Sequence, residues 1–325
     1  MRYCHVLLPD KTEPVCLPEI CVEEKDVIQH GPDVIISLPD LPHPPQPALE
    51  SENTPSLQSI LYGKELLLEE IQCTWEELNP FLRAGLVTVR AGLHPTKNGY
   101  KCRRCHNSDP ARFGVFFCAR CQKDCAYCRH CIMMGRISTC SALFRWNGPP
   151  SSFSPHISLH WDGIFSKGQK RATETIIQTI KEKDELLVWA VCGAGKTEIL
   201  FPGIETALQS GQRVLLATPR TDVVLELLPR FRHVFPEAII AGLYGKSEEK
   251  QILAQLVIAT THQTMRFADA FDTVIIDEVD AFPYTAETSL VQAVQKGKRK
   301  MPPRFISPRR QPIRCKSVYK NTPFP

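Results

Sequence analysis

The stretch LLVWAVCGAGKT, Leu186 to Thr197, decides the fold. It begins as a short apolar run with the length of a buried strand and ends in a glycine-containing turn closed by Gly-Lys-Thr. Residues 198–209 follow with the composition of a helix. A strand, such a turn and a helix in this order predict a phosphate-binding loop of the pattern G-x-x-x-x-G-K-[ST], with Ala190 in place of the first glycine.

The residues of this turn explain how it would hold a nucleotide. Successive backbone N–H groups and the positive end of the next helix form a concave site for phosphate. Gly193, Ala194 and Gly195 supply that main chain, and the two glycines carry no Cβ to obstruct it. Lys196 can reach the β- and γ-phosphates, and the Thr197 hydroxyl can ligate Mg²⁺. The alternative is a strand that happens to end in a glycine-rich turn.

A second apolar run, Thr273 to Asp280, ends in acidic residues. Asp277, where the run stops, is placed to hold Mg²⁺ through water, and Glu278 is the candidate to orient or activate the attacking water. An acidic cluster after a strand is usually a solvated turn. The Gly-Lys-Thr motif upstream in the same chain favours catalytic roles for Lys196, Asp277 and Glu278 instead.

Length and composition limit the class of protein. The chain has 325 residues, of which 43% are hydrophobic and 23% charged, which is typical of a soluble globular protein. It contains no apolar run long enough to span a membrane, and residues 1–21 carry acids and prolines where a signal peptide would be apolar. We therefore expect a cytoplasmic protein, with membrane association only through partners. Fourteen cysteines in such a protein indicate metal binding before disulfides.

The net charge of +4 conceals an uneven distribution. Ten Lys or Arg lie between Lys296 and Lys320 with no acid among them, so residues 1–295 carry 4 − 10 = −6. Within that negative part of the chain, residues 97–145 carry a positive charge, because they contain ten basic residues and only two acids, Asp109 and Asp124. A local excess of positive charge around a group of cysteines predicts a polyanionic partner.

Composition also divides the chain into segments. Residues 1–55 are variable and proline-rich, and no chemistry is assigned to them. The segment 56–96 has helical spacing of apolar residues and a capping box at Thr74 and Glu77. A cysteine-rich module at 97–145, the nucleotide-binding domain at 155–295 and a basic, proline-rich tail at 296–325 follow; we expect the tail to be disordered.

The cysteine-rich module is the strongest signal after the nucleotide site. Its eight thiols are Cys102, Cys105, Cys118, Cys121, Cys125, Cys128, Cys131 and Cys140. A C-x-x-C turn can place two thiolates on one metal ion, so eight thiols can hold two Zn²⁺ ions. The simplest first site consists of Cys102, Cys105, Cys118 and Cys121, although the spacing equally allows interleaved pairing. A redox centre or an iron–sulfur cluster is the competing interpretation.

Cations and aromatic residues surround these cysteines. Cations that track a phosphate backbone beside aromatic faces that stack on bases would suit single-stranded nucleic acid. Alternatively, the aromatic residues form the small core of the module and the cations its solvated face. The residues concerned are Lys101, Arg103, Arg104, Arg112, Arg120, Lys123, Arg129 and Arg136, with Tyr100, Phe113, Phe116, Phe117 and Tyr127.

Two more apolar runs, 213–220 and 256–263, end in polar loops, as the run containing Asp277 does. Strands that alternate with helices and carry polar residues at their ends predict an α/β domain with a parallel sheet, whose ligands bind at the carboxyl ends of the strands. Gln169 precedes a helix expected from about Lys170 to Glu182. Its amide can read adenine because it offers one donor and one acceptor, although a glutamine in isolation is usually a surface residue.

These motifs together resemble the ComFA family, the late competence proteins of naturally transformable Gram-positive bacteria, within the superfamily 2 helicase-like ATPases. The module around Cys125–Arg136 looks like the zinc region of that family. The resemblance covers about residues 60–295. The motifs that carry it are Trp161–Gln169, Ala190–Glu198, Ala217–Arg220, Thr260–Gln263 and Asp277–Pro283.

The resemblance implies an ATP-driven motor with a RecA-like domain that draws transforming single-stranded DNA into the cell. Its cofactors would be ATP, Mg²⁺ and Zn²⁺. By position, Gln169 would contact adenine, and Thr218, Arg220 and Thr261 would face the DNA backbone. Family partners would be the uptake-channel protein, ComFC and DprA, without direct membrane insertion, and a homo-oligomer is compatible with the family.

The sequence departs from the family pattern after Asp277–Pro283. Such ATPases continue with a Ser-Ala-Thr segment and a second RecA-like domain that supplies an arginine to the transition state. We therefore expect a shortened chain that alone binds ATP weakly and hydrolyses it poorly. The main alternative is a zinc-dependent nucleic-acid-binding module with an idle nucleotide site. A small-molecule P-loop kinase is a third reading, which explains neither the Asp277 motif nor the cysteines.

Overall fold

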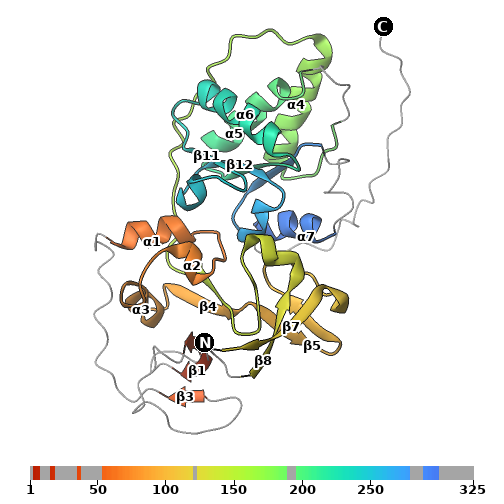
Figure 1. The fold of residues 1–325 in the computed structure, drawn as a ribbon. Helices are drawn as coiled ribbons and strands as arrows, with labels where there is room; N and C mark the ends of the chain where they lie inside the picture. Colours follow the sequence, from red (N-terminus) through yellow and green to blue (C-terminus); the bar gives the residue numbers. More distant parts are fainter. Residues whose placement is uncertain are drawn as a thin grey trace, which may run out of the picture.

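The computed structural model describes residues 3–7, 15–18, 35–37, 53–119, 123–188, 195–278 and 288–299. Two modules dominate it, a cysteine-rich module and an α/β domain around a parallel sheet, which corresponds to the predicted nucleotide-binding domain (Figure 1). Three short strands precede them and pair in the order β2-β1-β3: β1 (Tyr3–Leu7), β2 (Val15–Pro18) and β3 (Ile35–Ser37). Among the described residues, none of the helices has the length and apolarity needed to cross a lipid bilayer.

The nucleotide-binding domain contains a four-stranded parallel sheet in the order β11-β12-β10-β13. Its strands are β10 (Val214–Thr218), β11 (Ile240–Leu243), β12 (Leu256–Thr260) and β13 (Thr273–Ile276). The two central strands, β10 and β12, are buried along their whole length, which is why they read as continuous apolar runs. The parallel sheet predicted from the sequence is confirmed, and β11 is an additional strand.

The apolar run that opens the phosphate-binding stretch behaves differently from the prediction. Leu186, Leu187 and Val188 are not in a strand, and their exposed fractions are 43%, 72% and 40%. The expectation of a buried strand is therefore wrong for these three residues, because no helix or strand of the described residues covers them. Residues 189–194, which include Gly193 and Ala194, lie outside the described residues.

Helices pack beside this sheet (Figure 1). They are α4 (Lys167–Glu182), α5 (Phe201–Gln209) and α6 (Thr221–Val234), with the 3-10 turns η5 (Glu198–Leu200), η6 (Glu249–Gln251) and η7 (Gln263–Arg266). The helix predicted after the phosphate-binding turn is confirmed as η5 followed by α5. Helix α4 begins three residues before the expected Lys170 because Ser166 and Gln169 form a capping box at its start.

The cysteine-rich module begins with three short helices, α1 (Asn53–Leu61), α2 (Leu68–Ile71) and α3 (Trp75–Arg83). The predicted capping box of Thr74 and Glu77 opens α3. Strand β4 (Val87–Ala91) then pairs with β9 (Ala142–Trp146), which comes after all the clustered cysteines. The expected segments 56–96 and 97–145 therefore form a single unit, with the cysteine-bearing residues inserted between two paired strands.

Short hairpins carry the cysteines. They are formed by β5 (Leu93–Thr96) with β6 (Gly99–Cys102) and by β7 (Phe113–Cys118) with β8 (Lys123–Cys128). The 3-10 turns η3 (Pro110–Arg112) and η4 (Arg129–Met134) lie beside them in sequence.

Helix α7 (Thr288–Gly297) lies between the two modules (Figure 1). One hydrophobic cluster contains Leu290 of α7, Leu215 of β10 and Cys128 of β8, so the two modules share a core. The basic tail expected from residue 296 is incorrect at its start, because Lys296 lies within α7 and is buried. Residues 300–325 lie outside the described residues.

Candidate nucleotide site and cysteine clusters

The carboxyl ends of β10, β12 and β13 meet at one edge of the sheet. Thr218 is in register with Thr260, and Ala217 is in register with Ile276. Just beyond the strands, the Asp277 N–H donates to the Ala217 carbonyl at 2.8 Å and the Thr261 N–H donates to the Thr218 carbonyl at 3.0 Å. The predicted Asp277, Thr218 and Thr261 therefore lie at the same edge of the sheet, where ligands of parallel α/β proteins bind.

The acidic pair at the end of β13 has a defined local geometry. The Glu278 N–H donates to Asp277 Oδ1 at 3.0 Å, and Glu278 has φ of 53°, which turns the chain sharply out of the strand. Both residues are half-buried. The exposed Arg220 donates through Nε to Asp222 Oδ1 at 3.1 Å, and this contact, with a smaller contribution from Glu278, raises the pKa of Arg220.

Gln169 lies beside the end of the phosphate-binding turn. The Ser166 N–H donates to Gln169 Oε1 at 2.8 Å, which fixes the amide, and Gln169 Nε2 would be 2.5 Å from a Cβ placed on Gly195. Gly195 has φ of +71°, a conformation that favours glycine. The structure thus brings together Gln169 and the Gly195-Lys196-Thr197 turn, in which Lys196 is exposed and Thr197 half-buried.

The three residues expected to face DNA differ in exposure. Thr218 and Thr261 are fully buried, and neither hydroxyl has a hydrogen-bond partner in the described part of the chain. Arg220 is exposed. In this arrangement Arg220 is accessible to a nucleic acid, whereas contact with either threonine side chain requires the strand-end segments to move.

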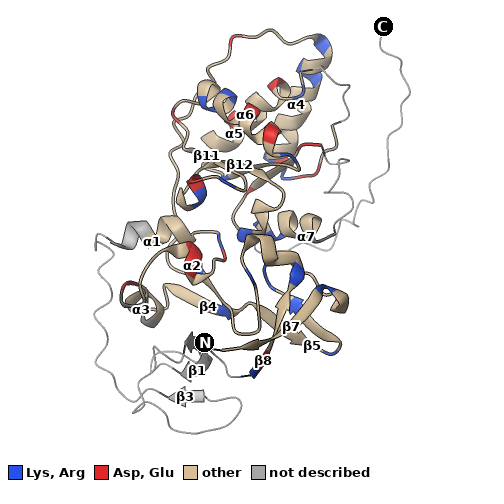
Figure 2. Ribbon diagram, viewed as in Figure 1, with Lys and Arg blue, Asp and Glu red and all other residues tan. Residues whose placement is uncertain are grey.

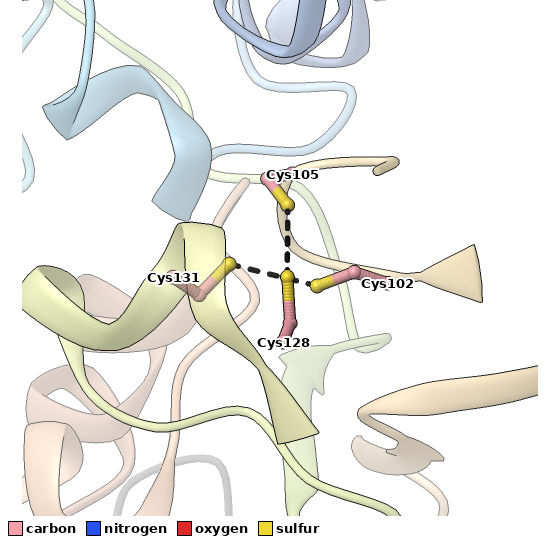
Figure 3. Close-up of side chains that lie close together, drawn as sticks. All are labelled: Cys102, Cys105, Cys128 and Cys131. Carbon is pink, nitrogen blue, oxygen red and sulfur yellow. Dashed lines mark hydrogen bonds between the residues drawn. The ribbon is translucent and has the colours of Figure 1, made fainter. Parts of the chain in front are cut away.

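Four cysteines of the module form a buried cluster, which we call cluster 1. Cys102, Cys105, Cys128 and Cys131 point toward one another (Figure 3). The sulfur atoms of Cys102 and Cys131 are 3.5 Å apart, and those of Cys105 and Cys128 are 3.7 Å apart. Tetrahedral metal–sulfur bonds of about 2.3 Å place sulfur atoms about 3.8 Å apart, whereas a disulfide requires about 2.0 Å. The donor set and spacing of cluster 1 therefore fit a metal ion.

The four thiols of cluster 1 shift one another's pKa in opposite directions. Hydrogen bonds from Cys102 and Cys105 lower the pKa of the Cys128 thiol, whereas hydrogen bonds within the cluster raise the pKa of Cys105 and Cys131. The spacing and burial of the sulfur atoms, and not these shifts, are therefore the observations that favour a metal ion.

A second group, cluster 2, contains Cys118, Cys125 and Cys140, whose sulfur atoms lie within 4.8 Å of one another. The Cys118 and Cys140 sulfurs are 3.7 Å apart, and Ser138 Oγ is 3.3 Å from the Cys140 sulfur. Cys121, the remaining predicted ligand, lies outside the described residues. Cluster 2 thus offers three thiols with metal-like spacing.

The pairing that seemed simplest from the sequence is wrong, and the interleaved alternative is the one found. Cys125 and Cys128 lie in the same strand, β8, three residues apart. Side chains alternate along a strand, so these two sulfurs face opposite sides of the hairpin and join different clusters. Because Phe116 is in register with Cys125, Cys118 lies on the Cys125 side, away from Cys102 and Cys105.

The aromatic residues near the clusters mostly pack against each other. Tyr100 pairs with Phe113 at 6.1 Å and Phe116 pairs with Tyr127 at 5.9 Å between ring centroids. These contacts favour the interpretation of a small core, whereas Phe117 is 63% exposed. Figure 2 shows basic residues on the same module, and the exposed ones include Lys101, Arg112, Lys123 and Arg129.

Buried charges at the junction of the modules are the features that sequence reasoning missed. Lys64 is 1% exposed, and its Nζ donates to the Lys250 and Ile252 carbonyls at 2.9 and 3.5 Å. Burial, reinforced by the nearby Arg213 and Arg266, lowers the pKa of Lys64 to about 7. A polar residue in a loop gives no sequence signal that it will be buried between modules.

The parallel sheet, with an acidic pair at its carboxyl edge, belongs to a helicase-like domain, because residues 164–301 match the family model described as type III restriction enzyme, res subunit. Residues 50–145 match the model described as competence protein ComFA N-terminal domain. The chain belongs to the ComFA family.

Two curated relatives support this assignment. The chain is 47% identical over 244 residues to competence protein ComFA of Bacillus subtilis, covering 75% of this chain and 52% of that protein. It is 38% identical over 192 residues to competence protein ComFA of Streptococcus pneumoniae, covering 56% of this chain and 44% of that protein. The chain thus spans about half the length of these relatives.

Proposed function

We propose that this chain provides the ATP-binding and metal-binding part of a motor that moves single-stranded DNA during competence. The observation that carries the proposal is the combination, in one ComFA-family chain, of the Gly195-Lys196-Thr197 turn with Asp277 and Glu278 at the edge of a helicase-like sheet. The family name supplies the competence role, and the site supplies the chemistry.

Each residue of the nucleotide site has a proposed role. Gln169, held beside Gly195, contacts the adenine, and Lys196 neutralises phosphate charge. Thr197 and Asp277 hold Mg²⁺, directly and through water respectively, and Glu278 orients the attacking water. Gly193 and Ala194, outside the described residues, complete the phosphate-binding main chain.

The proposed roles of the cysteines are structural. Cys102, Cys105, Cys128 and Cys131 hold one Zn²⁺ ion, since four buried thiols with tetrahedral spacing are typical of a closed structural site. Cys118, Cys125 and Cys140 hold a second ion, with Cys121 as the fourth ligand by its spacing from Cys118 in the sequence. When bound, the ions supply cross-links between hairpins that would otherwise have little core.

The partners follow from the family and from charge. Exposed cations of the cysteine-rich module and Arg220 at the sheet edge are suited to contact single-stranded DNA. The uptake-channel protein, ComFC and DprA are the protein partners that we expect from the family. Thr218 and Thr261 would join the DNA contact only after the buried edge opens.

A second candidate function is a zinc-dependent nucleic-acid-binding module whose nucleotide site is idle. The exposed Phe117, on a module with exposed cations, favours it, because an exposed aromatic face can stack on a base. The two candidates share the DNA contact and differ only in whether ATP is used.

The test is binding of a fluorescent ATP analogue with Mg²⁺ to the purified chain. Lys196→Ala should weaken binding at least about tenfold because a charge-assisted phosphate contact is lost. Lys181→Ala, which removes an exposed lysine on α4, should leave binding unchanged. Analogue binding that is equal in all three proteins, or absent from the wild type while a single-stranded oligonucleotide still binds, would favour the idle site.

A further inference from the structure

A buried ion network joins cluster 1 to the edge of the nucleotide-binding sheet. Its centre is Glu70, at the end of α2 in the cysteine-rich module. One carboxylate oxygen accepts a hydrogen bond from the guanidinium of Arg104, which is completely buried. The other oxygen accepts one from Arg266 Nε at 2.8 Å. Glu70 therefore binds two arginines from different parts of the protein at once.

Both arginines belong to elements with a proposed function. Arg104 lies between Cys102 and Cys105, and its Nη1 also donates to the Met134 carbonyl at 2.7 Å, at the end of η4, the turn that contains Cys131. Arg104 thus contacts both loops that supply the ligands of cluster 1.

On the other side, Arg266 ends η7, the turn that begins two residues after Thr261. Its Nη1 donates to Gln263 Oε1, and Gln263 Nε2 lies 3.5 Å from the Met134 sulfur. The segment Thr261–Arg266, which we call the edge segment, is therefore tied to the same carboxylate and the same η4 end as the cluster.

Lys296 of α7 makes a second connection between the same elements. Its Nζ donates at 2.9 Å both to the Arg104 carbonyl and to the Met265 carbonyl, and it pairs with Glu65 at 3.4 Å. The Glu65 N–H in turn donates to the Arg266 carbonyl at 2.7 Å. Movement of the edge segment would break contacts that also position the ligand loop of Cys102 and Cys105.

The edge segment contains a feature that favours movement. The Thr261 hydroxyl, like that of the neighbouring Thr218, is buried without a partner in the described part of the chain. Buried polar groups are rarely left unpaired, because each loses the hydrogen bonds that water would supply. The present position of the edge segment must therefore be held by other contacts, and the network around Glu70 provides them.

Charge gives a reason for the metal ion to affect this network. Three cations, the fully buried Arg104 and the largely buried Arg266 and Lys296, face two carboxylates, Glu65 and Glu70, which leaves one positive charge among these five residues. A divalent ion held by four thiolates carries a net charge of about −2. Metal bound at cluster 1 would thus compensate the buried cations.

We propose that Glu70 is a positioning residue that couples cluster 1 to the edge segment, so that metal bound at the cluster holds Thr261–Arg266 against the sheet and metal release loosens it. The inference rests on the proposed metal site. Coupling is reciprocal, so loosening the edge segment by mutation must also weaken metal binding.

The experiment uses the purified, zinc-loaded chain and its Glu70→Gln variant. The matched control is Glu69→Gln, the same change at the neighbouring exposed carboxylate. Two readouts are independent of catalysis: hydrogen exchange of the edge-segment amides before and after zinc is stripped with a chelator, and the rate of zinc transfer to a colorimetric chelator. Zinc content is measured on every sample.

In the wild type and in Glu69→Gln, stripping zinc should accelerate exchange of the edge-segment amides at least about tenfold, the factor expected for one lost charge-assisted contact. Glu70→Gln should exchange rapidly even with zinc bound, respond little to stripping, and release zinc severalfold faster. Arg266→Lys keeps the charge but loses the planar guanidinium with its several donors, so its exchange and zinc-release rates should lie between those of wild type and Glu70→Gln. This variant replaces Glu70→Gln in the test if Glu70→Gln folds poorly.

Two results would overturn the coupling, and they are distinguishable. The coupling alone would be refuted if zinc content is normal but the hydrogen-exchange rate of the edge-segment amides changes neither when zinc is stripped nor in Glu70→Gln. A wild-type chain that binds no zinc would refute the proposed metal site, and the coupling with it.

Discussion

Replacement of Lys64 by methionine should make the protein more stable at neutral pH and remove part of its pH dependence. Lys64 is buried between the modules with only carbonyl partners, and its pKa falls from 10.5 to about 7. Below pH 7, Lys64 is protonated in both the folded and the unfolded protein, so the full cost of burying its charge lowers the free energy of unfolding. This cost disappears as the pH rises toward 10.5, because the folded protein then carries the neutral amine. The contribution of Lys64 to the free energy of unfolding should therefore become more favourable between pH 7 and 10.5.

The magnitude follows from the size of this shift. A change of about 3.5 pKa units corresponds to about 5 kcal/mol at about 1.4 kcal/mol per unit. Methionine avoids that cost but leaves the Lys250 and Ile252 carbonyls without their donor, which costs about 2 kcal/mol in total. We expect Lys64→Met to be more stable by about 3 kcal/mol at pH 7, and this advantage to be lost as the pH approaches 9.5.

The assay is urea unfolding of both proteins at constant zinc between pH 7 and 10. Lys246→Met, at an exposed loop position, is the control and should differ from the wild type by a constant amount. A stability difference between Lys64→Met and wild type that does not change with pH, or a variant that is the less stable protein at pH 7, would refute this role of Lys64.

Further predictions concern single residues. Cys105→Ser should lower the bound zinc by one ion per chain in metal analysis, whereas Cys73→Ser, outside both clusters, should not. Gly195→Ala places a Cβ 2.5 Å from a side-chain amide at a φ of +71°, so binding of MgATP, followed by calorimetry, should weaken at least about tenfold. Phe117→Ala should weaken binding of single-stranded DNA by about 1–3 kcal/mol in fluorescence anisotropy at unchanged melting temperature, whereas Phe116→Ala should lower the melting temperature.

Strands buried on both faces were predictable from the sequence, because they consist of uninterrupted apolar residues. Strands β10 and β12 are of this kind. Strand β11 was missed because it is short and contains Gly242, a residue type that is depleted in strands. Apolar composition alone predicted a buried strand at Leu186–Val188, but these residues are exposed, because burial also requires a neighbouring element that covers the run.

The residues proposed for the nucleotide site could be named from the sequence because their types and spacing follow from phosphate chemistry, and their roles stay predictions. The ligand pairing of the cysteines was not, since it depends on Cys125 and Cys128 lying in a strand, where i and i+3 face opposite sides. The ion network was beyond sequence reasoning for a similar reason. Arg104 resembled a DNA contact and Lys296 the start of a tail, and only the packing of α2 and α7 between the modules buries them.

Steady-state ATP hydrolysis by the purified chain, measured with and without single-stranded DNA, shows directly whether nucleotide use and DNA contact belong to one motor. We expect a low rate, because the chain spans about half the length of its curated relatives, and we predict that DNA raises this low rate. Lys196→Ala should abolish the increase, while Lys181→Ala should retain it. A chain that binds both MgATP and single-stranded DNA, yet hydrolyses ATP at the same rate with and without the DNA, would show that the two sites do not work as one motor.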